Sequence, residues 1–190
     1  ITQDYTVSDV ILNETKSLVA DVDYQGVFSQ NTNAGIAKLT IIGLGNYSGT
    51  KEVEFKINQL NISGATITLI NSSLVYNGEL QTFKVSSVVT SGKISVDTFT
   101  VTNNAQTNVG NYTLTVTGSG NFIGSATKSF RITQKALTIT AKEQTIQKNG
   151  SIQNGTSQID ASGLISGHIV TSVTLTQSST TANGTITPSN

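Results

Sequence analysis

The chain has 190 residues, equal numbers of basic and acidic side chains, and a charged fraction of only 12%. Such a surface lacks the positive field that binding to nucleic acid or to an anionic membrane requires, so we expect no nucleic-acid partner and no membrane contact by this segment. Cysteine is absent, which excludes a disulfide framework and thiolate metal sites.

Polar positions are filled mainly by Ser, Thr, Asn and Gly, where a cytosolic protein usually carries Lys and Glu, and this favours an extracellular module. The chain begins at Ile1 without a signal peptide and without an apolar run long enough to cross a bilayer. We therefore expect an excerpt from a longer exported protein, with any anchor outside this segment.

The first predicted strands lie in residues 1–58. Ala37–Ile41 and Val53–Ile57 alternate apolar and polar side chains with a period of two, as half-buried antiparallel strands do. Between them, the glycines of Gly43–Gly49 permit the positive φ angles of a hairpin connection. Tyr47 lies inside this connection, and we expect its ring to fold back onto the end of the core.

Residues 59–134 contain a longer series of predicted elements, and no segment carries an apolar stripe with helical spacing. We expect a strand at Thr66–Leu69, a turn at Tyr76–Glu79, strands at Phe83–Val85, Phe99–Val101 and Tyr112–Val116, a hairpin connection at Gly118–Gly124, and a strand that ends with Phe130 and Ile132.

Part of this second series repeats the first. The pattern Gly, Leu-Thr, Gly-x-Gly-Asn-aromatic-x-Gly, Phe-x-Ile runs from Gly35 to Ile57 and again from Gly110 to Ile132, and 110 − 35 and 132 − 57 both give 75. A constant offset without gaps indicates one duplicated module. Its length exceeds the ~20–50 residues of solenoid units and fits a small folded domain.

The offset also predicts the module boundaries. Tyr76 corresponds to Ile1, so the first module lacks its opening strand, and we expect an incomplete sheet or an unpaired edge there. A third unit starts with a strand at Leu137–Ala141 and lacks the Gly-Asn-aromatic pattern. We therefore expect three β modules: 1–58, truncated at its N-terminus, 59–134, and 135–190, truncated at its C-terminus.

These modules resemble known families. The third unit, with Leu137–Lys142 followed by Ser162-Gly163-Leu164, is similar to the start of an MBG-type repeat of bacterial surface proteins. Residues 59–134 resemble, with more departures than the first module, the immunoglobulin-like repeats of large bacterial cell-surface proteins. In the first module the resemblance is carried by Asn31–Ala37, Leu39–Ile41, Gly43–Thr50 and Phe55–Ile57.

The resemblance implies tandem immunoglobulin-like β-sandwich modules in an elongated array on the bacterial cell surface. It implies display, spacing and adhesion, with neighbouring repeat domains as partners, no cofactor and no enzyme activity. We accordingly expect a monomeric structural repeat region that spaces or displays an adhesive region. The alternative is an adhesin module that itself binds a host glycan or protein.

Two motifs invite a chemical interpretation. Gly43–Gly49 misses the G-x-G-x-x-G spacing because Ser48 takes the place of a glycine, so a hairpin is favoured over a nucleotide loop. His168 is the only histidine, which excludes a histidine metal cluster and favours a loop residue.

Acidic and basic residues give weaker signals. Asp21 and Asp23 could offer oxygens to calcium, but their counterparts in the second copy, Val96 and Thr98, could not. Lys128 shares a strand face with Phe130 and Ile132, as a lysine in a Lys-Asn isopeptide crosslink would; a lysine whose amine reaches water from a sheet edge is favoured.

We assign no catalytic, cofactor-binding or metal-binding residue from the sequence. Tyr5, Phe28 and Tyr76 are the aromatic residues least readily assigned to the core. They are therefore the candidate ligand contacts of the adhesin alternative.

Overall fold

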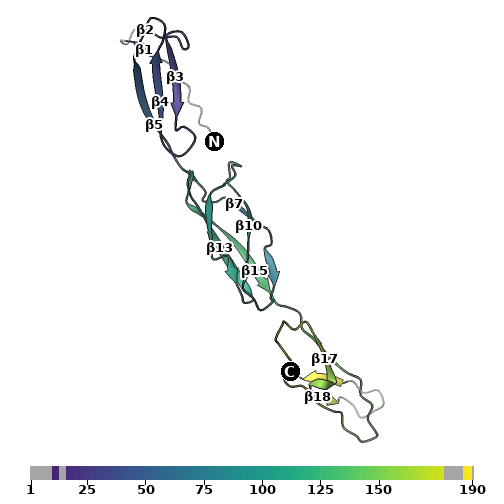
Figure 1. Cartoon of the computed structure of the whole chain (residues 1–190). Coiled ribbons are helices and arrows are strands. Elements are labelled where there is room, and N and C mark those ends of the chain that lie inside the picture. The colour runs from purple at the N-terminus through teal and green to yellow at the C-terminus, as the bar shows by residue number, and fades with distance from the viewer. Residues whose placement is uncertain (1–9, 13–15, 178–185, 190) are drawn as a thin grey trace. The chain divides into compact units, whose positions relative to one another are not determined.

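A computed structural model describes residues 10–12, 16–177 and 186–189 (Figure 1). Within these ranges the secondary structure consists of strands and one 3₁₀ turn, η1 (Thr156–Gln158), which confirms the expected all-β class. The chain divides into two compact units: the first is Ile1–Ile70, Lys84–Asn104 and Thr113–Lys128, and the second is Asn71–Phe83, Ala105–Tyr112 and Ser129–Asn190.

The first unit begins with a three-stranded antiparallel sheet in the order β3-β4-β5. Its strands are β3 (Tyr24–Ser29), β4 (Gly35–Gly43) and β5 (Thr50–Ile57), and β4 and β5 form the predicted hairpin. A two-stranded ladder of β1 (Ile11–Leu12) and β2 (Lys16–Ser17) precedes this sheet in the chain.

A four-stranded sheet follows, in the order β11-β13-β15-β8. It contains β11 (Phe99–Thr102), β13 (Gly110–Gly118), β15 (Ser125–Thr133) and β8 (Ser73–Val75). β13 and β15 form the second predicted hairpin, whereas β8, which the sequence pattern does not predict, runs parallel to β15.

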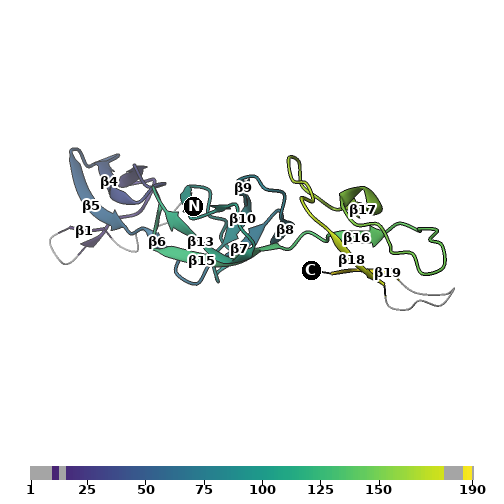
Figure 2. The same ribbon diagram turned by 90° about the horizontal axis from the view of Figure 1, so that it is seen from below.

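The remaining strands before residue 134 form short pairs. β7 (Thr66–Leu69) pairs with β10 (Val85–Val89), β9 (Gln81–Thr82) pairs with β12 (Ala105–Gln106), and β6 (Leu60–Asn61) runs parallel to β14 (Phe122–Ile123). Both views place β7 and β10 beside β13 (Figures 1 and 2).

The predicted strand at Phe83–Val85 is wrong at its first two residues. Phe83 lies between β9 and β10, outside any strand, and its side chain is only 1% exposed. Its ring centroid lies 4.1 Å from that of Phe130, and the Tyr112 ring lies 5.6 Å from Phe130. The chain leaves the sheet here because the aromatic ring takes part in core packing, which outweighs local strand propensity.

The end of the second unit holds two further antiparallel pairs. β16 (Thr138–Ala141), predicted within Leu137–Ala141, pairs with β17 (Ile159–Ser162), and β18 (Thr174–Gln177) pairs with β19 (Ile186–Ser189). Among the residues of this part whose burial the structure describes, Ile159 and Leu175 are the buried apolar ones.

The two hairpins share one geometry at the predicted offset. Tyr24 pairs with Gly43 across β3 and β4, and Phe99 pairs with Gly118 across β11 and β13. The N–H of the glycine that ends β4 or β13 donates a 3.0 Å hydrogen bond to the O of the glycine that ends the connection, in both hairpins. The matching sequence therefore forms matching backbone structure.

Burial differs between the hairpins. In the second, Leu114 and Val116 are fully buried and Phe122 closes the end of the core, as predicted. Their counterparts in the first, Leu39 and Ile41, are only half-buried, and so is Tyr47.

Candidate functional site

Asn121 connects the loop of the second hairpin to the first sheet. Its side-chain oxygen accepts a 2.8 Å hydrogen bond from the N–H of Ala34, and its side-chain nitrogen donates a 3.0 Å bond to Oδ1 of Asn33. Asn33 and Ala34 lie in the turn between β3 and β4. A single amide, with a donor and an acceptor in one plane, thus holds this turn at two points.

The segment after β5 adds further bonds to the same loop. The side-chain nitrogen of Gln59 donates a 2.8 Å bond to the O of Gly120, and the N–H of Leu60 donates a 2.8 Å bond to the O of Asn121. The latter bond opens the parallel β6–β14 ladder. All of these residues belong to the first unit.

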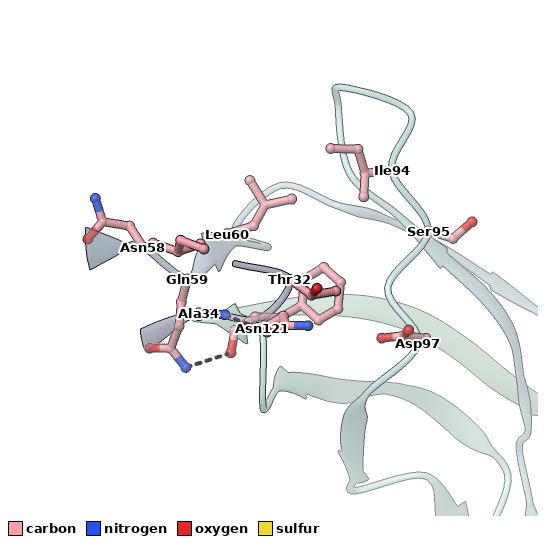
Figure 3. Close-up of a pocket in the computed structure, with 11 residues that line it drawn as sticks. Thr32, Ala34, Asn58, Gln59, Leu60, Ile94, Ser95, Asp97 and Asn121 are labelled. Atoms are coloured by element: carbon pink, nitrogen blue, oxygen red, sulfur yellow. Dashed lines mark hydrogen bonds between the residues drawn. The ribbon is translucent and has the colours of Figure 1, made fainter. Parts of the chain in front are cut away.

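A cleft of about 420 Å³ lies beside this junction. In Figure 3, Asn58, Gln59 and Leu60 lie on one side and Ile94, Ser95 and Asp97 on the other, with the Asn121 amide and Ala34 between them. The lining residues are Thr32, Ala34, Ile57, Asn58, Gln59, Leu60, Ile94, Ser95, Asp97, Asn121 and Phe122.

The cleft is lined by both apolar and polar side chains and carries one carboxylate. Of its lining residues, Ile57 and Phe122 are buried, while Thr32, Ser95 and Asp97 are exposed. Among its described lining residues, Asp97 is the only ionisable one, and its Oδ1 accepts a 3.0 Å bond from the Thr98 hydroxyl. This carboxylate and the hydroxyls of Ser95 and Thr32 are groups that can form hydrogen bonds with a ligand.

The predicted ligand contacts are not brought together. Phe28 is half-buried and packs edge-on against Phe55, with ring centroids 6.1 Å apart. Tyr76 is half-buried in the second unit, where its N–H donates a 2.9 Å bond to the O of Thr133. Tyr5 lies outside the described residues. Their role as ligand contacts therefore stays a prediction.

The glycine and histidine interpretations agree with the structure. The Gly43–Gly49 segment joins two antiparallel strands, with Gly45 at φ 61° and Gly49 at φ 99°. His168 is exposed in a turn, where its N–H donates a 3.1 Å bond to the O of Ile165.

The acidic and basic candidates occupy local positions. Oδ2 of Asp23 accepts a 3.0 Å bond from the N–H of Val19, and Asp21 is exposed with a φ of 61°. Lys128 is half-buried on β15. In the described ranges, no group of three His, Cys, Asp or Glu side chains lies close enough together to hold a metal ion.

Lys38 forms a small ion-pair cluster on the first sheet. A hydrogen bond and ion pair with Glu52, 3.4 Å away, and a second pair with Glu54, 3.5 Å away, raise the pKa of Lys38 above its usual 10.5. The three side chains lie on the same face of β4 and β5, so the ion pairs link the two strands side chain to side chain.

The sequence alone does not identify the residues of this junction. The sequence marks Asn121 only as a landmark of the repeated pattern, and Asn33 only within the family resemblance. Their contact spans 88 positions of the sequence, and no local periodicity encodes it.

No protein-family model matches the chain, and no curated protein or solved structure matches it either. The fold and the junction define an all-β protein with two hairpins of matching sequence and register. Among the residues that the structure describes, no helix is long and apolar enough to cross a membrane.

Proposed function

We propose that this chain is a structural repeat region of a bacterial cell-surface protein, built from immunoglobulin-like β-sandwich modules that space or display an adhesive region. The observation that carries the proposal is the double hydrogen bond of Asn121 to Asn33 and Ala34. It joins two matching hairpins by direct contacts in addition to the covalent connection. Bonds of this kind restrict bending between consecutive modules, which a spacer requires.

The distribution of aromatic residues also supports a spacing role. Every aromatic side chain whose burial the structure describes is buried or half-buried. Sugar-binding modules commonly hold their ligands on exposed, flat aromatic rings, which supply a large apolar area with a polar edge. The extracellular location is part of the proposal and is supported by the Ser, Thr, Asn and Gly composition.

The second candidate function is that of an adhesin module that binds a host glycan or protein itself. The cleft of about 420 Å³ favours it, because its size suits one or two sugar rings or a short peptide loop, and its rim is polar. In this case the Asp97 carboxylate would accept hydrogen bonds from the ligand, and the Ser95 hydroxyl would donate or accept them.

A binding screen separates the two functions. Purified protein is tested against glycans, mucins and extracellular-matrix proteins, with the double variant Ser95→Ala, Asp97→Ala as the loop control, because both side chains are exposed and their loss should leave the core intact. Binding that the variant loses would establish the adhesin function. Absence of binding, together with a monomeric and elongated particle in small-angle scattering, would support spacing.

A further inference from the structure

The cleft beside the Asn121 junction has walls that hydrogen bonds hold in place. The turn that carries Thr32 is bonded to the Asn121 amide, and the segment after β5 is bonded to Gly120 through the Gln59 side chain. The third wall is the loop between β10 and β11. A preformed cleft loses little conformational entropy when a ligand enters it, which favours binding.

The loop between β10 and β11 is fixed by its own bonds. The N–H of Thr90 donates a 2.9 Å bond to the O of Ile94, and the N–H of Ile94 donates a 3.1 Å bond to the Thr90 hydroxyl. The N–H of Val96 donates a 2.9 Å bond to the O of Val88, and Val96 is buried. Asp97 follows directly, so its side chain starts from a fixed backbone position.

Asp97 gives this cleft a negative charge. Its Oδ1 accepts the bond from the Thr98 hydroxyl, which leaves further lone pairs of the carboxylate for another donor. Among the residues that the structure describes, the ion pairs belong to Lys38 and Lys142, and neither lysine is paired with Asp97. A cationic ligand is therefore favoured over a neutral or anionic one.

The rest of the cleft offers apolar surface. Leu60 and Ile94 are half-buried, and Ile57 and Phe122 are buried. In Figure 3, Leu60 lies across the cleft from Ile94 and Asp97. The methylene groups of a long basic side chain pack on apolar surface while its charged end reaches a carboxylate. A volume of about 420 Å³ is that of a small-ligand site and leaves room for an apolar residue beside the basic one.

We propose that this cleft binds an extended segment of a partner protein that carries an arginine next to an apolar residue. The guanidinium donates two parallel N–H bonds to the Asp97 carboxylate, and the apolar neighbour contacts Leu60. Arginine suits this site better than lysine because its planar group keeps donors for a second acceptor such as the Thr32 hydroxyl. The proposal rests on the second candidate function, the adhesin module, and specifies its ligand.

Binding in this cleft is coupled to the junction. Thr32 belongs to the turn between β3 and β4, whereas Asp97 comes shortly before β11 of the four-stranded sheet. A ligand that contacts both residues binds best when the Asn121 bonds hold these segments together. The ligand and the junction therefore strengthen each other by the same factor.

The direct test is an NMR titration of the full chain with the peptide acetyl-Gly-Leu-Arg-Leu-Gly-amide. We expect saturable shifts at the amides of Thr32, Leu60 and Asp97. In the control peptide, citrulline replaces arginine, which keeps the shape and removes the charge, and the affinity should fall about tenfold. Equal affinity of the two peptides, or no saturable shift at these residues, would overturn the proposal.

Two carboxylate variants locate the charge that the ligand recognises. Asp97→Asn keeps an oxygen that can accept from Thr98 and removes the charge, whereas Glu79→Gln removes the charge of an exposed carboxylate in the other unit. We expect the first variant to weaken binding of the arginine peptide about tenfold and the second to leave it unchanged. Wild-type affinity in Asp97→Asn would refute the proposal.

Asn121→Ala tests the coupling. It should weaken binding of the arginine peptide about fivefold, and an unchanged affinity would contradict a ligand that spans the junction. A neutral glycan that binds the same cleft equally well in the wild type and in Asp97→Asn would support the adhesin function and overturn the arginine ligand. The spacing function is tested separately, by the orientation of the two hairpins in the chain without peptide.

Discussion

The side-chain oxygen of Asn121 accepts a hydrogen bond from the N–H of Ala34, 87 positions earlier in the chain, at 2.8 Å. The counterpart of Asn121 in the first hairpin is Asn46, which likewise stands between a glycine and an aromatic residue but is exposed. The same position of the repeated pattern therefore lies in an exposed turn in the first copy and forms the junction in the second.

Replacing Asn121 by alanine should loosen this junction while both sheets stay folded. Two hydrogen bonds are lost, each with a net contribution of about 0.5–1.5 kcal/mol, and the N–H of Ala34 gains access to water. We expect residual dipolar couplings from β3-β4-β5 and from the second hairpin to fit one alignment tensor in the wild type and two in the variant.

Asn46→Ala is the matched control, since it removes the same side chain from the same position of the other loop. It should leave the common tensor unchanged. If Asn121→Ala also leaves it unchanged, the Asn121 amide does not determine the orientation, and the proposed spacing function loses its main support.

The glycines that end the two connections should differ in their tolerance of a side chain. Gly49 and Gly124 both have positive φ angles, 99° and 84°, so alanine is strained at either position by about 1–2 kcal/mol. At Gly124 a Cβ would also collide with Oδ1 of Asn61, whereas at Gly49 nothing lies within 4 Å. Thermal unfolding should therefore show a clearly lower Tm for Gly124→Ala than for Gly49→Ala. Equal shifts would show that Asn61 moves aside without cost.

The sequence predicts the parts of this fold that local patterns encode. The alternation of β4 and β5, the glycine connections and β7 follow from side-chain period and turn chemistry, and the structure has them where expected. The short strand β8 carries no such period, because its parallel pairing depends on β15, a partner far along the chain. The sequence pattern predicts a strand at Phe83 because β propensity takes no account of the contact between Phe83 and Phe130 in the core.

The candidate site is less predictable than the fold. Asn121 and Gln59 are ordinary polar residues of a chain rich in such residues, and only the three-dimensional arrangement distinguishes them. The aromatic residues are candidates for ligand contact only because the sequence pattern does not assign them to the core. In the structure, one of them, Phe28, packs against Phe55. Exposure can be inferred from strand parity, but convergence of side chains from distant turns cannot.

The ion pairs of Lys38 give a prediction about high pH. The pKa of Lys38 is raised by Glu52 first and by Glu54 second, so the folded chain binds this proton more tightly than the unfolded chain does. The resulting stabilisation is present below the unfolded pKa and is lost as the pH rises through the higher folded pKa. Replacing both glutamates by glutamine should lower the pKa of Lys38, measured from its Cε chemical shift, with little change in stability because the group is exposed. A pKa that stays in place would show that these carboxylates do not control it.

The unequal cover of the two sheets predicts unequal costs for one substitution. Leu114→Ala leaves a cavity in a closed core and should lower the free energy of unfolding by about 2–5 kcal/mol. Leu39 occupies the matching position but is half-buried, so solvent fills the space that its side chain leaves, and Leu39→Ala should cost less than about 2 kcal/mol. Denaturant unfolding measures both. Equal costs would show that the first sheet is covered as closely as the second.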